Sequence, residues 1–274
     1  MEPRISKCWR SWPLERQQGF YRRFQQQHSE TQTMKLFTAI YNDAKLLGSF
    51  LRHYDQYGIT EFFIAASPSF ASMVKGFMGK YRITLFEGLD VADSILGGTA
   101  AVTEMRRIHQ QDDEWVVIVD LDEFAEFVPD IHHFSSIAED EDANVVRGIM
   151  YDRFNVDGTL VDVSQATDLR KLFPVKARFI EKVMYGCDHK GILVKGQLKA
   201  TGAHHFFEGE KLSSEVLEIA HYKWITGAID RLRSATQLVE EAGIRWHIEY
   251  KRALDHYERY GRFAWETFGG EMVG

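Results

Sequence analysis

Apolar and polar residues alternate in blocks along the first half of the chain. Short runs rich in Val, Ile, Phe and Ala, typical of buried strands, are separated by longer segments whose apolar residues recur every three or four positions, as in amphipathic helices. Strands are predicted at 35–41, 62–66, 82–86 and 115–120, and helices at 44–57, 70–79, 91–110 and 129–138. Regular alternation of strands and helices predicts a parallel, doubly wound α/β sheet.

The second half of the chain has a less regular pattern. Strands are predicted at 145–151, 172–175, 192–194 and 215–222, and two helices at 226–242 and 246–260. Within this half, residues 152–205 are rich in Gly, Asp, Lys and His, a composition typical of loops that cover a site.

We expect three parts in the chain. Residues 34–235 hold the α/β domain and residues 236–274 form a C-terminal helical extension. Residues 1–33 form an extension that contains six Arg and Lys but only three Glu, with aromatic residues between them. Such a segment suits peripheral contact with a membrane surface or a partner. We favour the simpler alternative, a partly helical segment packed on its own domain, because its apolar stripe is short.

Composition excludes several classes of protein. The net charge is −7, whereas proteins that bind nucleic acid need a basic surface for the phosphate backbone. The two cysteines provide neither a disulfide framework nor a cysteine-rich zinc site. No apolar run approaches the length of a membrane span. We therefore expect a cytoplasmic protein, or one held at the inner face of the membrane by a partner.

The strongest chemical signal is the segment 115–124, where five apolar residues lead into three carboxylates. Ligand crevices of open α/β sheets lie at the carboxyl ends of the strands. Asp120 and Asp122 are two positions apart, so in an extended chain they point to the same side. Two adjacent carboxylates repel unless a cation or basic groups compensate them. A Mg²⁺ or Mn²⁺ ion that carries a diphosphate would do so; the alternative is a solvated strand-to-loop corner.

Four short elements of the chain resemble those of family-2-type glycosyltransferases with the GT-A fold. They are Tyr41-Asn42-Asp43 with the later His53 and Gly58, Asp120-Leu121-Asp122-Glu123-Phe124, Lys190 with Gly202-Ala203-His204-His205, and His221-Tyr222. The resemblance implies a GT-A-like, Rossmann-type central sheet, mostly parallel and flanked by helices, with a smaller irregular acceptor-side region and C-terminal helices.

By this resemblance the chain moves a sugar, with inversion, from a nucleoside-diphosphate sugar to a glycan, a lipid-linked acceptor or another cell-surface acceptor. The implied metal ligands for Mn²⁺ or Mg²⁺ are Asp120, Asp122 and His221. The implied donor-binding residues are Tyr41, Asn42, Asp43, Asp120, Lys190 and His205. The candidate catalytic bases are Asp188, Asp157 and Glu123. The family commonly carries an acidic residue after its second strand, whereas residues 65–69 here contain none, so the nucleotide base stays open.

Two alternatives share the aspartate signal. Phosphatases of the haloacid-dehalogenase type also place an Asp-x-Asp string after an apolar strand. Their string lies on the first strand and ends in Thr or Val, whereas Glu123 and Phe124 follow here on the fourth strand. A non-catalytic nucleotide-sugar-binding protein on the same fold is the second alternative; it would bind a nucleotide without turnover.

Overall fold

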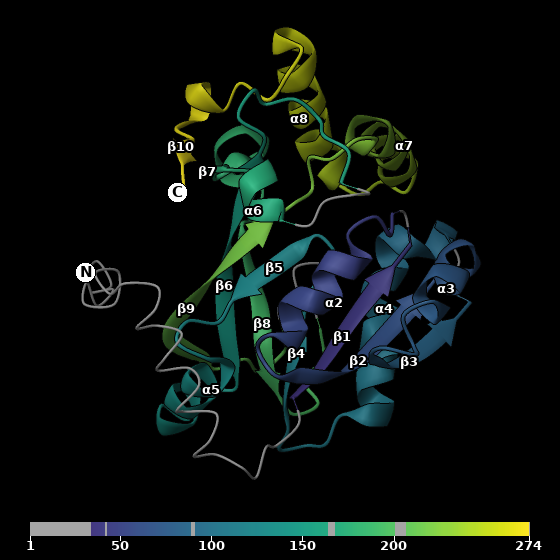
Figure 1. Ribbon diagram of the computed structural model, residues 1–274, viewed down its shortest axis with the longest axis vertical. Coiled ribbons are helices and arrows are strands. Elements are labelled where there is room, and N and C mark those ends of the chain that lie inside the picture. The colour runs from purple at the N-terminus through teal and green to yellow at the C-terminus, as the bar shows by residue number, and fades with distance from the viewer. Residues whose placement is uncertain (1–33, 42, 89–90, 164–167, 201–206, 274) are drawn as a thin grey trace. The chain divides into compact units, whose positions relative to one another are not determined.

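The computed structural model describes residues 34–41, 43–88, 91–163, 168–200 and 207–273. The chain from Met34 to Gly274 forms one compact unit built around a ten-stranded sheet (Figure 1). The N-terminal segment 1–33 lies outside the described residues, so the expectation about it stays a prediction. The domain boundary expected at residue 235 falls inside helix α7 (Ala228–Glu241).

The first half of this unit is a parallel β/α array, as the hydrophobic pattern predicts. Four strands lie side by side in the order β3-β2-β1-β4, and each neighbouring pair is parallel. The elements are β1 (Met34–Ile40), α2 (Leu47–Asp55), β2 (Ile59–Ala66), α3 (Pro68–Lys75), β3 (Arg82–Glu87), α4 (Val91–His109) and β4 (Trp115–Ile118). This arrangement confirms the predicted α/β fold class.

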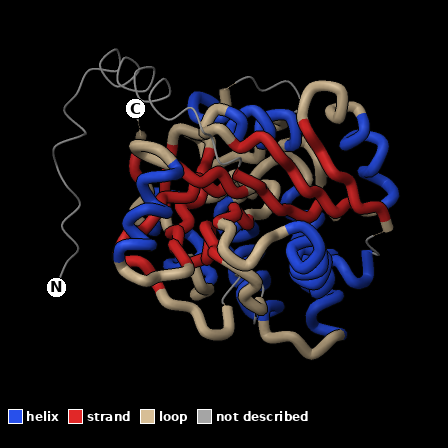
Figure 2. The backbone as a smooth tube through the Cα atoms, turned by 90° about the horizontal axis from the view of Figure 1, so that it is seen from below, coloured by secondary structure: helices blue, strands red, loops and turns tan. Residues whose placement is uncertain are grey.

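Helices cover both faces of the parallel strands (Figure 2). Alternate residues of a strand point to opposite faces, and β1 shows the pattern clearly. Leu36 and Ile40 pack with the apolar face of α2, whereas Phe37 and Ala39 pack with Val102 of α4. Burial on both faces is the reason that these strands read as continuous apolar runs in the sequence.

Beyond β4 the sheet becomes mixed. Strand β8 (His189–Lys195) pairs antiparallel with β4, and β6 (Val145–Phe154) pairs antiparallel with β8. Strand β9 (Leu212–His221) runs parallel to β6 and antiparallel to β5 (Glu123–Glu126). The remaining elements are α5 (Ile131–Asp140), α6 (Leu169–Leu172), β7 (Val175–Ala177), η1 (Ile180–Met184), α7, α8 (Trp246–Tyr260), η2 (Trp265–Phe268) and β10 (Glu271–Met272).

One predicted strand is wrong. Residues 172–175 were expected to be extended, but α6 ends at Leu172 and β7 begins only at Val175. The carboxylate of Asp168 accepts hydrogen bonds from the backbone N–H groups of Arg170 (3.1 Å) and Lys171 (3.3 Å), so a helical turn forms here. Pro174 then separates the helix from the strand, because proline has no backbone N–H to donate.

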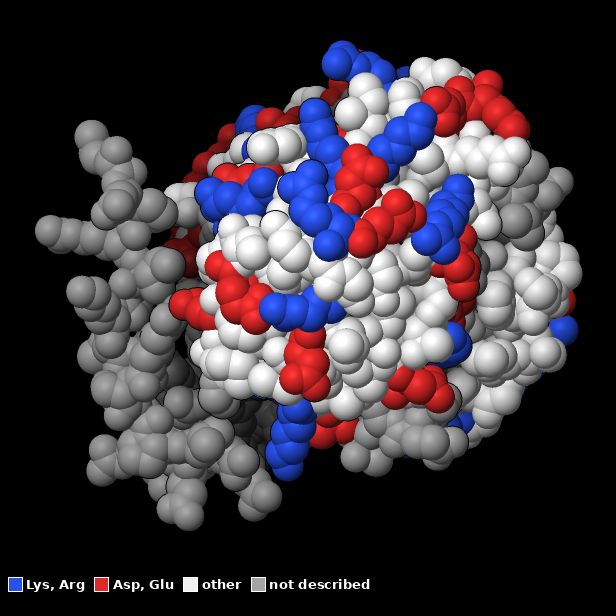
Figure 3. Space-filling view, turned by 90° about the horizontal axis from the view of Figure 1, so that it is seen from above, with Lys and Arg blue, Asp and Glu red and all other residues white. Residues whose placement is uncertain are grey.

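The two C-terminal helices pack against each other near the carboxyl ends of the parallel strands (Figure 1). Exposed ion pairs join them, with 3.1 Å between Arg233 and Glu258 and 2.6 Å between Lys251 and Glu240. Figure 3 shows basic and acidic side chains next to one another on the face seen from this end. Across the described part of the chain, none of the helices has both the length and the apolar composition that spanning a membrane requires.

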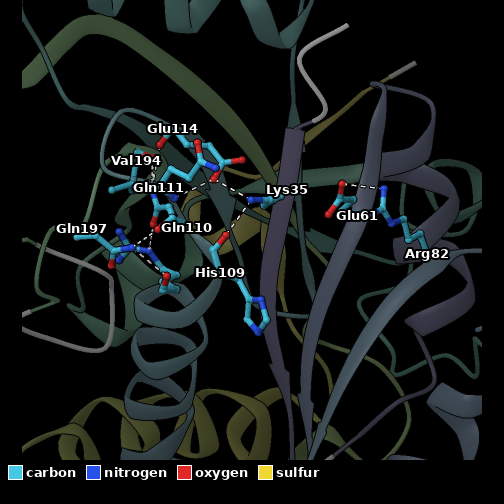
Figure 4. Close-up of polar contacts among 10 residues, drawn as sticks. Lys35, Glu61, Arg82, His109, Gln110, Gln111, Glu114, Val194 and Gln197 are labelled. Atoms are coloured by element: carbon cyan, nitrogen blue, oxygen red, sulfur yellow. Dashed lines mark hydrogen bonds and ion pairs between the residues drawn. The ribbon is translucent and has the colours of Figure 1, made fainter.

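A polar network fixes the opposite end of the sheet, where the parallel strands begin (Figure 4). The Lys35 ammonium on β1 donates to the carbonyl of His109 (2.8 Å) and pairs with Glu114 (2.9 Å). The Gln110 amide donates to the carbonyl of Glu114 (3.0 Å), and the Gln197 amide to that of Arg106 (3.0 Å). A surface hollow of about 560 Å³ borders this network, away from the acidic strand end described below.

Tyr54 of α2 holds strand β5 in place. Its buried hydroxyl donates to the carbonyl of Glu123 (2.9 Å) and accepts from the N–H of Ala125 (3.0 Å). We expect Tyr54→Phe to lower the free energy of unfolding by about 2 kcal/mol, because it leaves two buried backbone groups without partners. Urea denaturation measures the effect.

Tyr81→Phe is the matched control for this variant. Tyr81 is also buried, and its hydroxyl has no hydrogen bond among the described residues. We expect its loss to change stability by less than about 0.5 kcal/mol. Equal losses in the two variants would contradict the role given to the Tyr54 hydroxyl.

Candidate functional site

Three carboxylates lie where β4 turns into β5. The turn holds Asp120 and Asp122, and Glu123 begins β5. The Asp120 and Asp122 side chains are 46% and 33% exposed, whereas that of Glu123 is 3% exposed. The Glu123 carboxylate folds back and accepts the backbone N–H of Asp120 at 2.8 Å. Two of the three acids therefore face outward and the third supports the turn from inside.

Lys190 of β8 neutralises part of this charge. Its fully buried ammonium lies 2.6 Å from an oxygen of Asp120 and 2.7 Å from an oxygen of Glu123. Burial opposes the charge on Lys190, but the two carboxylates outweigh it and raise the pKa of the lysine. Burial raises the pKa of Glu123 to about 7, with Asp120 adding to the effect of burial and Lys190 opposing it. The predicted donor-binding lysine is thus joined to the predicted metal-binding turn.

His221 ends β9 between two acid-bearing strands. The strand register sets Glu123 of β5 on one side of it and Asp152 of β6 on the other. Its Nε2 atom lies 3.4 Å from Oδ2 of Asp122, and its Nδ1 atom lies 3.0 Å from Oδ1 of Asp152. The imidazole therefore connects an outward-facing aspartate with an inner one.

Asp152 is fully buried and its carboxylate accepts three hydrogen bonds. Besides His221, the indole N–H of Trp224 donates to Oδ1 at 2.8 Å, and the backbone N–H of Ile180 donates to Oδ2 at 3.1 Å. These donors fix the carboxylate, which in turn fixes the orientation of the His221 ring. Nε2 is left directed at Asp122.

Charge stabilises this pair strongly. Burial favours the neutral form of His221, but the carboxylate of Asp122, followed by that of Asp152, raises its pKa to about 10. Burial also opposes ionisation of Asp122, yet His221, Lys223 and Lys190 together hold the pKa of this carboxyl well below its usual range. Near neutral pH the two groups form an imidazolium–carboxylate pair.

A divalent cation would bind this pair only in place of the proton on Nε2, which it would displace. A carboxylate oxygen and a histidine Nε2 whose Nδ1 is held by a second carboxylate form a common metal-binding arrangement. Among the described residues no group of three His, Cys, Asp or Glu gathers as metal ligands. Asp122 and His221 would thus supply two ligands and leave positions for phosphate oxygens and water, as Mg²⁺ and Mn²⁺ sites commonly do. The role of Asp120 as a third ligand stays a prediction, since its carboxylate pairs with Lys190.

The exit of β1 borders these groups. Burial, followed by the charges of Asp120 and Asp122, raises the pKa of the Tyr41 hydroxyl well above its ordinary value. Asp43 lies 2.7 Å from Arg231 of α7 and accepts the N–H of Lys45 at 2.9 Å. The structure thus brings Tyr41 to the acids and ties Asp43 to α7.

The other predicted site residues have different surroundings. Asp188 is buried and pairs with the guanidinium of Arg178, whose Nε lies 2.7 Å from its carboxylate. Asp157 lies on an exposed loop that Arg262 contacts through a backbone carbonyl. Asn42 and His205 lie outside the described residues.

Two residues of the site were not identified from the sequence. Asp152 follows the strand predicted at 145–151 but lies inside β6, and its pairing with His221 depends on a register between distant strands. Lys223 follows His221 by two positions, and its ammonium lies 5.5 Å from the centre of the Tyr250 ring. Burial opposes its charge, whereas Tyr250, Asp122 and Asp152 raise its pKa. Lys223 thus adds a cation whose charge acts on the acids of the site.

Asp152, His221 and Asp122 form a chain of contacts, called the relay below, and replacing Asp152 tests it. We expect Asp152→Asn to weaken Mn²⁺ binding about 10- to 100-fold, because the acceptor of the His221 Nδ1–H loses its negative charge. Glu218→Gln is the control, since Glu218 lies on the same strand as His221 and pairs with Lys176 at 2.7 Å, away from this ring. Calorimetric titration with Mn²⁺ measures both variants; equal affinities in the two would contradict the relay.

Three of the solved structures that resemble this chain are distant likenesses. No protein-family model and no curated protein matches the chain. HddC from Yersinia pseudotuberculosis aligns with 73% of this chain and 97% of its own, at 6% identity and a TM-score of 0.39. The inositol-1-phosphate CTP transferase of T. maritima covers 80% of this chain and 97% of its own, at 8% identity and a TM-score of 0.38.

A third solved structure, the 4-diphosphocytidyl-2C-methyl-D-erythritol synthase of Anaerococcus prevotii, covers 68% of this chain and 87% of its own, at 13% identity and a TM-score of 0.37. Likenesses at this level carry no argument about chemistry. The functional conclusion therefore rests on the geometry of the site.

Proposed function

We propose that the chain is a metal-dependent glycosyltransferase that moves a sugar from a nucleoside-diphosphate sugar to an acceptor hydroxyl, with inversion. One observation carries the proposal: Asp122, His221 and Asp152 form a relay at the carboxyl end of β4. Its members come from three segments far apart in the sequence, and ligand crevices of α/β sheets lie at this end. The resemblance of Asp120-Leu121-Asp122-Glu123-Phe124 and His221-Tyr222 to glycosyltransferase elements agrees with it.

The residues divide the work as follows. Asp122 and the Nε2 of His221 would hold Mn²⁺ or Mg²⁺, which supplies a Lewis acid for the departing diphosphate. Lys190 keeps Asp120 and Glu123 in place from inside the protein. Lys223 has no carboxylate within ion-pair distance among the described residues, so we assign it, rather than Lys190, to the negative charge of the leaving diphosphate. Tyr41 lies beside the acids, where the nucleotide would run along the end of β1.

Calorimetry with a panel of nucleoside diphosphates tests the proposal. UDP, GDP, dTDP, CDP and ADP are titrated into the protein with Mn²⁺ and, separately, with EDTA. We expect at least one to bind at least ten times more tightly with Mn²⁺. The proposal is lost if none binds, or if Mn²⁺ makes no difference to the one that does.

Identification of the reaction products separates the competing chemistries. Release of a nucleoside diphosphate from a nucleotide sugar supports glycosyl transfer. Release of pyrophosphate from a nucleoside triphosphate and a sugar phosphate would instead show nucleotidyl transfer. Hydrolysis of a generic phosphoester with a trapped aspartyl-phosphate at Asp120 would show a phosphatase, and binding without turnover would show a non-catalytic protein.

A further inference from the structure

One carboxylate near the site has no assigned role. Glu249 lies in the first half of α8, which packs against η1. Its carboxylate meets the turn that follows η1, since a Cβ atom added to Gly186 would lie 2.6 Å from its Oε2. The side chain is half-buried, and among the described residues it makes no hydrogen bond or ion pair. A half-buried carboxylate without such a partner can accept a proton from a bound ligand.

Lys223 links the start of α8, where Glu249 lies, to the proposed donor site. The charge of the Lys223 ammonium acts to lower the pKa of Asp122 in the relay and also that of Glu249. Tyr250, the residue after Glu249, has its ring under the same ammonium. It also contributes to the raised pKa of the Tyr41 hydroxyl. The start of α8 therefore contacts the lysine that follows His221 by two positions.

The turn beside Glu249 presents an aromatic ring to solvent. Tyr185 has a backbone φ of 55°, the left-handed region that non-glycine residues seldom adopt, and it is 71% exposed. The guanidinium of Arg252 lies 4.7 Å from the centre of its ring and donates to the carbonyl of Met184 at 2.9 Å. Strain of this kind persists where the surroundings hold it, often at ligand-binding turns. An exposed ring on the turn that the Glu249 carboxylate meets matches the apolar face and hydroxyl edge of a sugar.

We propose that Glu249 is the general base of the transfer and that Tyr185 carries the acceptor sugar beside it. This inference rests on the proposed function. The acceptor oxygen forms a bond to the anomeric carbon while the bond from that carbon to the diphosphate oxygen breaks. The hydroxyl proton passes to the carboxylate of Glu249, and the electron pair of the broken bond leaves with the diphosphate.

Glu249 fits this role better than the three bases suggested by the sequence. The carboxylate of Asp188 is occupied by Arg178, and that of Glu123 is enclosed and shared with Lys190. Asp157 lies on an exposed loop, and no contact among the described residues links it to the acidic turn. Glu249 combines partial exposure with a side chain that makes no ion pair among the described residues, and the charge of Lys223 acts on it.

The environment also tunes Glu249 for proton transfer. Burial raises its pKa, and the charges of Lys223 and Arg252 oppose this only in part. A base acts when it is ionised, so activity falls as pH falls through its pKa. We expect the acidic limb of the pH profile of kcat/KM to lie above the ordinary glutamate pKa of about 4.3.

Variants of α8 test the assignment. The readout is release of nucleoside diphosphate from UDP-, GDP- and dTDP-hexoses with Mn²⁺, with p-nitrophenyl glycosides as acceptors. We expect Glu249→Gln to lower kcat by about 10²- to 10⁴-fold while the affinity for the nucleoside diphosphate stays within about twofold. Glu249→Asp should keep part of the activity and shift the acidic limb. Tyr185→Ala should raise the KM of the glycoside at least fivefold without changing donor affinity.

Glu258→Gln is the control on the same helix, because Glu258 is exposed and pairs with Arg233. Thermal unfolding of each variant shows that the fold is retained. Glu249→Gln activity within about threefold of the wild type, with an unchanged acidic limb, would overturn the assignment and leave the proposed function standing. A wild-type protein that neither binds a nucleoside diphosphate nor releases one would remove both.

Discussion

Replacement of Asp122 by asparagine should lower the rate of sugar transfer about 10³-fold. Asp122 is the outward-facing member of the relay, and its carboxylate faces Nε2 of His221 at 3.4 Å. Asparagine keeps the shape but removes the negative charge that a divalent cation requires of this position. Loss of about 4 kcal/mol of stabilisation of the departing diphosphate corresponds to this factor. The rate is measured as nucleoside diphosphate released from the donor that calorimetry identifies.

Two further measurements make this result specific. The dependence of nucleoside diphosphate affinity on Mn²⁺ should disappear in Asp122→Asn, while weak metal-independent binding remains. Asp140→Asn, an exposed change at the end of α5, should leave both the rate and the Mn²⁺ dependence as in the wild type. If Asp122→Asn retains more than about a tenth of the activity, the carboxylate does not hold the metal.

Replacement of Lys190 by methionine should lower the free energy of unfolding by about 3–5 kcal/mol. Its ammonium is fully buried and touches both Asp120 and Glu123, so its removal leaves Glu123 enclosed without a counter-charge. Breaking a buried ion pair from one side costs far more than removing both partners. Urea denaturation measures the loss, and the double variant Lys190→Met, Glu123→Gln should regain at least half of it.

Lys195 provides the matched control on the same strand. It pairs with Glu139 at 2.9 Å, but its side chain is 32% exposed and that of Glu139 is 50% exposed. Solvent screens such pairs, so Lys195→Met should cost at most about 1 kcal/mol. Equal losses at the two lysines would show that Lys190 does not organise the acidic turn.

The sequence was most informative where structure depends on local patterns. Runs such as 115–119 are apolar because they are buried on both faces, so the strands of the parallel half were predictable. The predicted helix at 246–260 coincides with α8, Trp246–Tyr260. Asp130, expected at the start of a helix, accepts the N–H of His133 as its N-cap.

Features that depend on contacts between distant segments were not predictable. Strand β5 has only four residues and exists because it pairs with β9, almost a hundred positions later. The position of Asp152 beside His221 follows from the parallel register of β6 and β9. A single sequence contains both residues but does not state their register.

In the candidate site, the identity of several residues was predictable from the sequence but their burial was not. The aspartate string, Lys190 and His221 were chosen from the sequence, and the structure brings them together around one turn. Lys190 differs from the expectation in its surroundings, because its ammonium is enclosed between two carboxylates. Burial of a side chain is a property of packing, and the lysine itself carries no local sign of it.

Anomalous diffraction from crystals grown with Mn²⁺ and a mixture of nucleoside diphosphates tests the central claim most directly. We expect a manganese peak about 2.0–2.3 Å from a carboxylate oxygen of Asp122 and from Nε2 of His221, with diphosphate oxygens completing its coordination. His221 should remain bonded to Asp152 through Nδ1. A crystal with bound nucleotide in which Nε2 of His221 still contacts the Asp122 carboxylate directly, with no manganese between them, would contradict the claim.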